Sequence, residues 1–114
     1  MFTIRTEQLD RLAQARLRDF ELRMVNHAKK QYPEETAAIG DDAAVLELIQ
    51  RTIAHGRTLG IVTERDVAAL IGLSVLYGEK FEETAEDPDI AATLRDLEIS
   101  PKSRLELVLG MLPD

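Results

Sequence analysis

Few side chains in this 114-residue sequence are of a kind and spacing that could do chemistry. The two histidines, His27 and His55, stand far apart, and neither belongs to a His-Glu-x-x-His pattern that would bind zinc. Cysteine is absent, which excludes thiol nucleophiles, thiolate metal sites and disulfides. No glycine-rich phosphate-binding motif occurs either. We therefore predict no metal, no cofactor and no nucleophilic catalytic residue, and we interpret both histidines as structural or solvent-facing.

The carboxylates are the remaining reactive groups, and they are concentrated in one part of the chain. Residues 1–57 carry nine basic and nine acidic side chains, whereas residues 79–98 carry eight acidic and two basic ones. An EF-hand calcium loop is not formed there, because Pro88 interrupts the alternating oxygen ligands and no glycine follows. General acid-base catalysis by Glu82, Glu83 or Asp87 stays open, and it would need a deep pocket around these residues.

The acidic stretch has two further interpretations. It is a solvated surface that keeps the protein soluble, or it is a docking surface for a basic partner, where charge raises the association rate more than the affinity. Arg65 joins the second interpretation, because a cation in the first turn of a helix opposes the helix dipole and needs a carboxylate partner elsewhere in the fold or in another chain. The predicted partner-binding residues are Glu79, Phe81, Glu82, Glu83, Glu86, Asp87, Asp89 and Arg65.

Signals for helix beginnings and ends divide the chain into elements that must position these groups. Residues 7–31 lack Gly and Pro and repeat apolar residues at spacings of three or four, which predicts a long amphipathic helix. A short helix over 34–39 follows Pro33, and Asp41 caps a third helix over 42–57. The stripe of the first helix consists of Leu9, Ala13, Leu17, Phe20, Met24 and Ala28.

The second half of the chain predicts three more helices. Thr63 caps residues 64–77, which are apolar nearly all round and therefore fit a buried central helix. Gly72 within it is expected to permit the close approach of a neighbouring helix. Asp-Pro and Ser-Pro pairs begin short helices over 88–97 and 101–111. Their predicted inward residues are Ile90, Ala91, Leu94, Leu97, Leu105, Val108, Leu109 and Leu112.

These elements predict an all-α fold, a compact bundle of five to six helices in a single domain over residues 1–114. The opening residues run into a charged helix, and no apolar stretch is long enough to cross a bilayer. We therefore expect a cytoplasmic protein with no signal sequence and no membrane partner. The formal net charge of −7 argues against nucleic acid as a partner, because phosphates require a basic face.

Three stretches of the sequence, residues 1–9, residues 59–67 and residues 77–81 with the later Asp87-Pro88, resemble one family. It consists of small, uncharacterised helical bacterial proteins encoded among the spike, adaptor and toxin genes of type VI secretion clusters. Its members follow the Gly-x-x-Phe turn with aspartate and later with Pro-Trp, whereas Glu82 follows Phe81 here and tryptophan is absent. A contact surface built on that tryptophan is therefore expected to be absent or altered. The resemblance implies a chaperone, an adaptor-associated protein or an immunity protein.

We predict from the residues and the resemblance together that this is a non-enzymatic protein-binding protein. Its expected partner is a secreted toxin or a spike or adaptor component. Two alternatives stay open. The first is a structural homo-oligomer that uses leucines outside the helix stripes, such as Leu22 and Leu107. The second is a small enzyme that uses the acidic residues.

Overall fold

A computed structural model describes the backbone of residues 6–113 and the side chains of Arg11 and of residues 13–113. Within this range the chain forms seven α-helices and no strand, which confirms the predicted all-α fold. Every predicted helix is present, and α5 is an additional one in the segment expected to be a connection. The helices are α1 (Thr6–Gln31), α2 (Pro33–Ile39), α3 (Asp42–Thr58), α4 (Glu64–Tyr77), α5 (Phe81–Thr84), α6 (Pro88–Leu94) and α7 (Pro101–Met111).

The beginnings of four helices follow from capping side chains that the sequence predicted. Asp41, Thr63, Asp87 and Ser100 each accept a hydrogen bond from a backbone N–H two or three residues further along. The N–H groups in the first turn have no acceptor within the helix, so these bonds fix where each helix begins.

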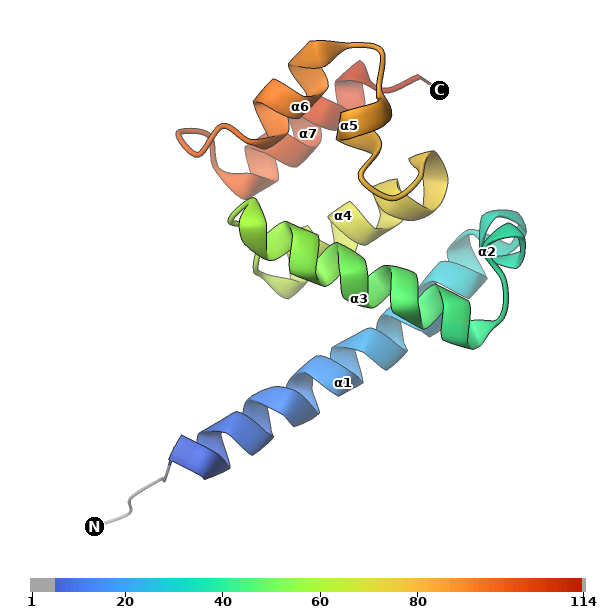
Figure 1. The fold of residues 1–114 in the computed structure, drawn as a ribbon, viewed down its shortest axis with the longest axis vertical. Coiled ribbons are helices and arrows are strands. Elements are labelled where there is room, and N and C mark those ends of the chain that lie inside the picture. The colour runs from blue at the N-terminus through green and yellow to red at the C-terminus, as the bar shows by residue number, and fades with distance from the viewer. Residues whose placement is uncertain (1–5, 114) are drawn as a thin grey trace.

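Helix α4 is central to the arrangement. It contacts α1, α2, α3, α5 and α7, as expected for the predicted central helix. In Figure 1, α1 and α3 cross on one side of the molecule, and α5, α6 and α7 gather at the other end. The molecule measures 55 × 37 × 18 Å, and its length reflects the projection of α1 beyond the other helices.

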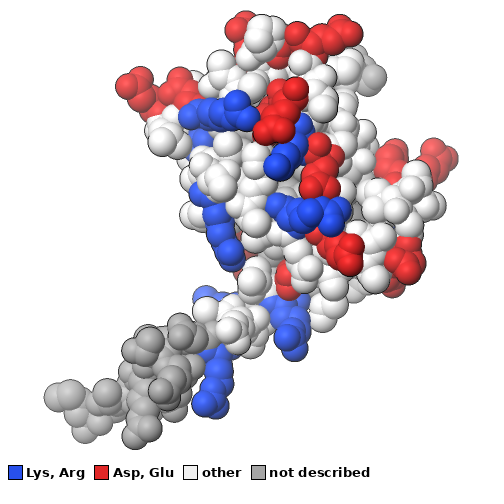
Figure 2. Space-filling view, in the orientation of Figure 1, with Lys and Arg blue, Asp and Glu red and all other residues white. Residues whose placement is uncertain are grey.

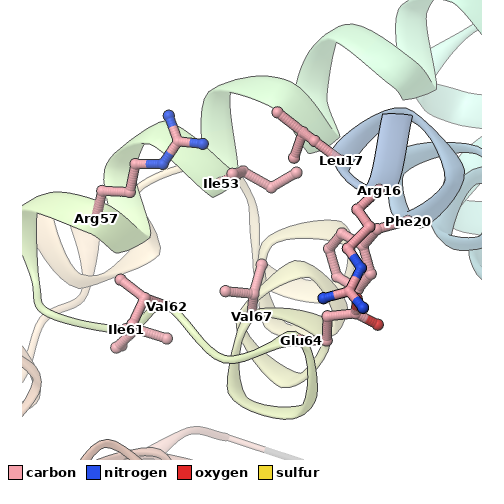
Figure 3. A pocket seen from close by; sticks show the side chains of 9 residues that line it. All are labelled: Arg16, Leu17, Phe20, Ile53, Arg57, Ile61, Val62, Glu64 and Val67. Atoms are coloured by element: carbon pink, nitrogen blue, oxygen red, sulfur yellow. The ribbon is translucent and has the colours of Figure 1, made fainter. Parts of the chain in front are cut away.

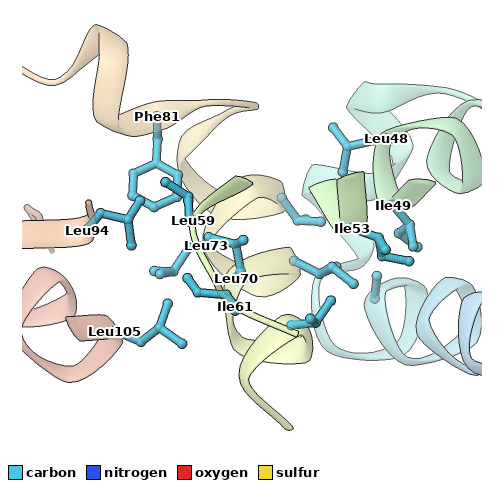
Figure 4. Packing of buried hydrophobic residues seen from close by; sticks show 14 of the residues in the cluster. Leu48, Ile49, Ile53, Leu59, Ile61, Leu70, Leu73, Phe81, Leu94 and Leu105 are labelled. Atoms are coloured by element: carbon cyan, nitrogen blue, oxygen red, sulfur yellow. The ribbon is translucent and has the colours of Figure 1, made fainter. Parts of the chain in front are cut away.

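One core of aliphatic side chains runs through both ends of the molecule. Ile49 and Ile53 of α3 pack toward α1, and Leu70 of α4 extends the core toward Leu94 and Leu105 (Figure 4). Phe81 closes this end of the core and is only 2% exposed. The segment after α4 is therefore anchored by α5 rather than being a free acidic connection.

The apolar stripe predicted for α1 contacts the core only in its second half. Four of its members are buried or half-buried, namely Leu17, Phe20, Met24 and Ala28. Ala13 is exposed, because the helix there projects past α3 and α4, and Leu9 lies outside the described side chains. Val25 is buried although the stripe did not include it. The described side chains from Arg11 to Arg16 are all exposed.

The predicted inward faces of the last two helices are partly wrong. Helix α6 ends at Leu94, because the Asp96 carboxylate accepts from the backbone N–H of Glu98 and turns the chain, so Leu97 is 76% exposed. In α7, Leu105 and Val108 are buried as predicted, but Leu109 is 58% exposed.

Arg104 is buried although the predicted inward face of α7 did not include it. Its guanidinium donates to the carbonyl oxygens of Leu59 and Leu94, each at 2.7 Å, and of Ile99 at 3.0 Å. Leu59 follows the last residue of α3 and Leu94 is the last residue of α6, so the cation lies at the negative ends of two helix dipoles. These contacts set the rotation of α7 and turn Leu109 outward.

Candidate interaction surface

The acidic segment after α4 is split between the interior and the surface. Phe81 and Glu82 are 2% and 3% exposed, so neither side chain is open to a partner in the isolated chain, and Phe81 anchors the segment in the core. Phe81 packs into the core as the first residue of α5. The next residue, Glu82, turns its carboxylate toward His55 at the end of α3. The short α5 helix therefore directs both side chains inward.

Two of the remaining predicted acidic residues form ion pairs within the chain. The Nε of Arg51 donates to both carboxylate oxygens of Glu79, at 3.0 and 2.9 Å, and these hydrogen bonds raise the pKa of the Arg51 guanidinium above its ordinary value. Glu83 lies 3.4 Å from a guanidinium nitrogen of Arg95. Both pairs are largely open to solvent, so they contribute little to stability.

Four predicted residues remain as an exposed acidic face. We define the acidic face as Glu83, Glu86, Asp87 and Asp89, which are all exposed. Asp87 also caps α6 by accepting from the backbone N–H of Asp89 at 2.9 Å. Figure 2 shows acidic side chains at the end of the molecule that α5 and α6 occupy, and further ones on the side where α2 lies.

The residues predicted for acid-base catalysis do not line any described cavity. None of the described cavities is lined by Glu82, Glu83 or Asp87. Figure 3 shows one small cavity of about 130 Å³ between α1, α3 and the beginning of α4. Its walls are mostly apolar, and its single carboxylate, Glu64, accepts a hydrogen bond from Arg23 at 3.0 Å. That contact raises the pKa of Arg23.

The two histidines lie in different environments, because His55 is half-buried and His27 is exposed. Nε2 of His55 contacts Oε1 of the buried Glu82, whose other oxygen has no hydrogen-bond partner among the described groups. The neighbouring hydroxyls of Thr58 and Ser74 donate to backbone carbonyls, so neither is held by His55 as a nucleophile would be. His27 is exposed on α1. No group of three potential metal-binding side chains occurs in the part of the chain that the structure describes.

A groove of about 460 Å³ runs along α4 and was not predicted. Helix α4 was expected to be buried all round, but one stripe of it stays uncovered: Arg65, Ala69, Gly72 and Leu76. Lys102, Glu106 and Leu109 of α7 line one side of this stripe, and His27 and Tyr32 line the other. We call this the α4–α7 groove.

The floor of the groove is made of small residues and its far end is apolar. A Cβ atom on Gly72 would lie 3.4 Å from the Tyr32 hydroxyl, so the close approach expected at this glycine is made by a side chain rather than by a second helix. Leu76 is 42% exposed beside Leu109. These two exposed leucines in one groove are candidates for contact with a second protein. The sequence signals for the groove were the small residues within an apolar helix and the excess of leucines in α7.

Arg65 is the one predicted partner-binding residue that lies in this groove. It is exposed, and no carboxylate within the described part of the chain forms an ion pair with it. The expected partner of Arg65 is therefore not among these residues.

No family model, curated protein or solved structure matches this chain. No described helix meets the length and apolarity that a membrane span requires.

Proposed function

We propose that this chain is a non-enzymatic accessory protein that binds a partner protein through the α4–α7 groove. The observation that carries the proposal is the uncovered stripe of α4, where Ala69 and Leu76 face solvent beside Leu109. Covering the last exposed face of a helix that is apolar nearly all round removes apolar surface from water and is therefore stabilising. A second protein that covers the stripe supplies that burial.

The sequence resemblance supplies the class of partner for this proposal. It supports a type VI secretion toxin, or a spike or adaptor component, with this chain as chaperone, adaptor-associated protein or immunity protein. The acidic face has a separate role, because its exposed carboxylates raise the rate at which a partner with basic regions approaches. The groove then supplies most of the affinity, since burial of apolar surface is the dominant favourable term in most protein association.

Site-specific cross-linking tests the proposal. The photoreactive residue p-benzoylphenylalanine replaces Leu109 in one variant and the exposed Leu22 of α1 in a matched control. Each purified variant is irradiated with the products of the adjacent genes, one at a time. We expect one product to be cross-linked from position 109 and not from position 22, and the yield to fall when Leu76→Asp is added.

Two outcomes decide against the proposal. If no adjacent gene product is cross-linked from position 109, or if Leu76→Asp leaves the yield unchanged, the groove is not the binding site. Co-expression with a cross-linked toxin then separates the roles. A chaperone raises the amount of soluble toxin, whereas an immunity protein restores growth and leaves the amount of soluble toxin unchanged.

A homo-oligomer is the second candidate, and the exposure of Leu22 and Leu107 favours it. Neither leucine lines the α4–α7 groove, so self-association through them leaves the groove open. Light scattering over a wide concentration range tests this candidate, and a mass that stays at 12.8 kDa would exclude it.

A further inference from the structure

Two cations mark one end of the α4–α7 groove. Arg65 and Lys102 are each the second residue of their helix, after Glu64 in α4 and Pro101 in α7. A positive charge in the first turn opposes the helix dipole, so neither position favours a cation for the stability of its own helix. Both side chains are exposed, and no ion pair involves either within the described part of the chain.

Helices α4 and α7 run in the same direction along the groove. At one end, the Arg104 guanidinium in the first turn of α7 donates to the carbonyl of Leu59, which lies shortly before α4. At the other end, the Tyr77 hydroxyl of α4 donates to the carbonyl of Pro113 at 2.7 Å, just beyond α7. The positive ends of both helix dipoles therefore lie beside Arg65 and Lys102.

Two carboxylates also line the groove, but neither pairs with these cations. The Asp66 carboxylate accepts from the Thr63 hydroxyl at 2.8 Å within the cap of α4. Glu106 lies one turn further along α7, toward Leu109. The end of the groove at Arg65 and Lys102 thus carries two exposed cations without an ion pair among the described residues, and the end at Leu76 and Leu109 is apolar.

The length of the groove fits a short helix. From Arg65 to Leu76 the stripe rises through eleven residues of α4, which is about 16 Å or three turns. The small side chain of Ala69 leaves room on the floor for a large apolar residue of an incoming helix, and the Tyr32 side chain lies over Gly72. Both walls are helical, and the described residues offer no strand edge for an extended peptide.

We infer that the α4–α7 groove binds a three-turn amphipathic helix of a partner protein, with carboxylates at the C-terminal end of that helix lying over Arg65 and Lys102. This inference rests on the proposed function and adds the chemistry and direction of the partner segment. The negative end of the incoming helix meets the positive ends of α4 and α7, so it runs antiparallel to both. Its apolar residues cover Ala69 and reach Leu76 and Leu109.

A display library of 14-residue helix-forming peptides, randomised at all surface positions, provides the probe. Peptides selected on the wild-type protein are expected to carry Asp or Glu in their last turn and apolar residues at i, i+3, i+4 and i+7. Their dissociation constants are then measured by fluorescence anisotropy. The variant R65E/K102E is expected to weaken binding by about tenfold or more, because two attractive contacts become repulsive.

Matched controls separate this inference from the proposed function. The variant R11E/R18E reverses two exposed charges on α1 outside the groove and is expected to leave affinity unchanged. Leu76→Asp tests the groove itself, with Leu22→Asp as its control. Peptides that respond to Leu76→Asp but not to R65E/K102E, or that carry their acids in the first turn, would overturn the inference and leave the proposed function standing. The absence of any selected peptide, or of any response to Leu76→Asp, would overturn both.

Discussion

Glu82 and Arg104 are the two charged side chains buried in the described part of the chain, and they are accommodated in different ways. Arg104 has three carbonyl acceptors. Glu82 has one contact, from Nε2 of His55 to Oε1, and its Oε2 has none among the described groups. A buried carboxylate depends strongly on such a single partner, because desolvation of the charge is costly.

Neither burial could be predicted from the sequence. Charged residues in short helices are usually exposed, and the sequence spacing of His55 and Glu82 gives no sign that α5 folds back onto α3. The acidic composition around Glu82 pointed to a surface instead. The pair forms because Phe81 enters the core and carries the next residue of α5 with it.

We predict a marked asymmetry between substitutions at this pair. His55→Leu leaves the Glu82 carboxylate buried without its partner and should lower the free energy of unfolding by about 3 kcal/mol. Glu82→Leu leaves a histidine whose side chain is 16% exposed and should cost less than about 1 kcal/mol. The double variant should resemble Glu82→Leu. Urea titrations of all four proteins measure this cycle, and equal losses for the two single variants would contradict it.

At the scale of the elements, the sequence predicted where helices begin better than which way they face. Asp41, Thr63, Asp87 and Ser100 mark their helices through bonds to N–H groups two or three residues away, so the information is local. The rotation of α7 depends instead on carbonyls at the ends of α3 and α6, which are distant in sequence.

The α4–α7 groove was missed for the same reason. The residues of α4 are apolar on every face, which is consistent with complete burial. Only the placement of α7 leaves the stripe with Ala69 and Leu76 uncovered. Arg65 was the exception, because a cation at a disfavoured helix position is visible in the sequence before its surroundings are known.

Two of the glycines within helices, Gly56 and Gly72, provide a matched pair for testing the packing of these elements. A Cβ atom on Gly56 would lie 3.0 Å from the backbone carbonyl oxygen of Ile61, whereas one on Gly72 would lie 3.4 Å from the Tyr32 hydroxyl. The first contact is with backbone that cannot move away easily, and the second is with the end of a side chain.

We predict that Gly56→Ala and Gly72→Ala change stability in opposite directions. Gly56→Ala should destabilise the protein by about 1–2 kcal/mol through overpacking. Gly72→Ala should stabilise it by up to about 1 kcal/mol, since alanine favours the helix and the space is sufficient. Thermal unfolding followed by circular dichroism measures both. A lower melting temperature for Gly72→Ala would show that the Tyr32 side chain leaves too little space for a methyl group at that position.

At the scale of the whole molecule, the charged surfaces and the buried polar contacts involve different residues. The acidic face lies on and around α5 and α6, whereas Arg65 and Lys102 lie where α4 and α7 begin. Arg104 of α7, by contrast, is only 2% exposed, and its guanidinium connects α7 to the ends of α3 and α6. Stability and the proposed binding thus depend on different residues of α7.

We predict that Arg104→Met uncouples α6 and α7 from the rest of the molecule. Methionine fills much of the space but leaves the carbonyls of Leu59 and Leu94 without their donor, so the free energy of unfolding should fall by about 3 kcal/mol. Hydrogen exchange should accelerate most in α6 and α7 and least in the crossing of α1 with α3. Arg104→Lys, which keeps the charge but has only one nitrogen, should fall between the two proteins. A loss under about 1 kcal/mol, or exchange that accelerates equally in all helices, would show that apolar packing alone holds α7 in place.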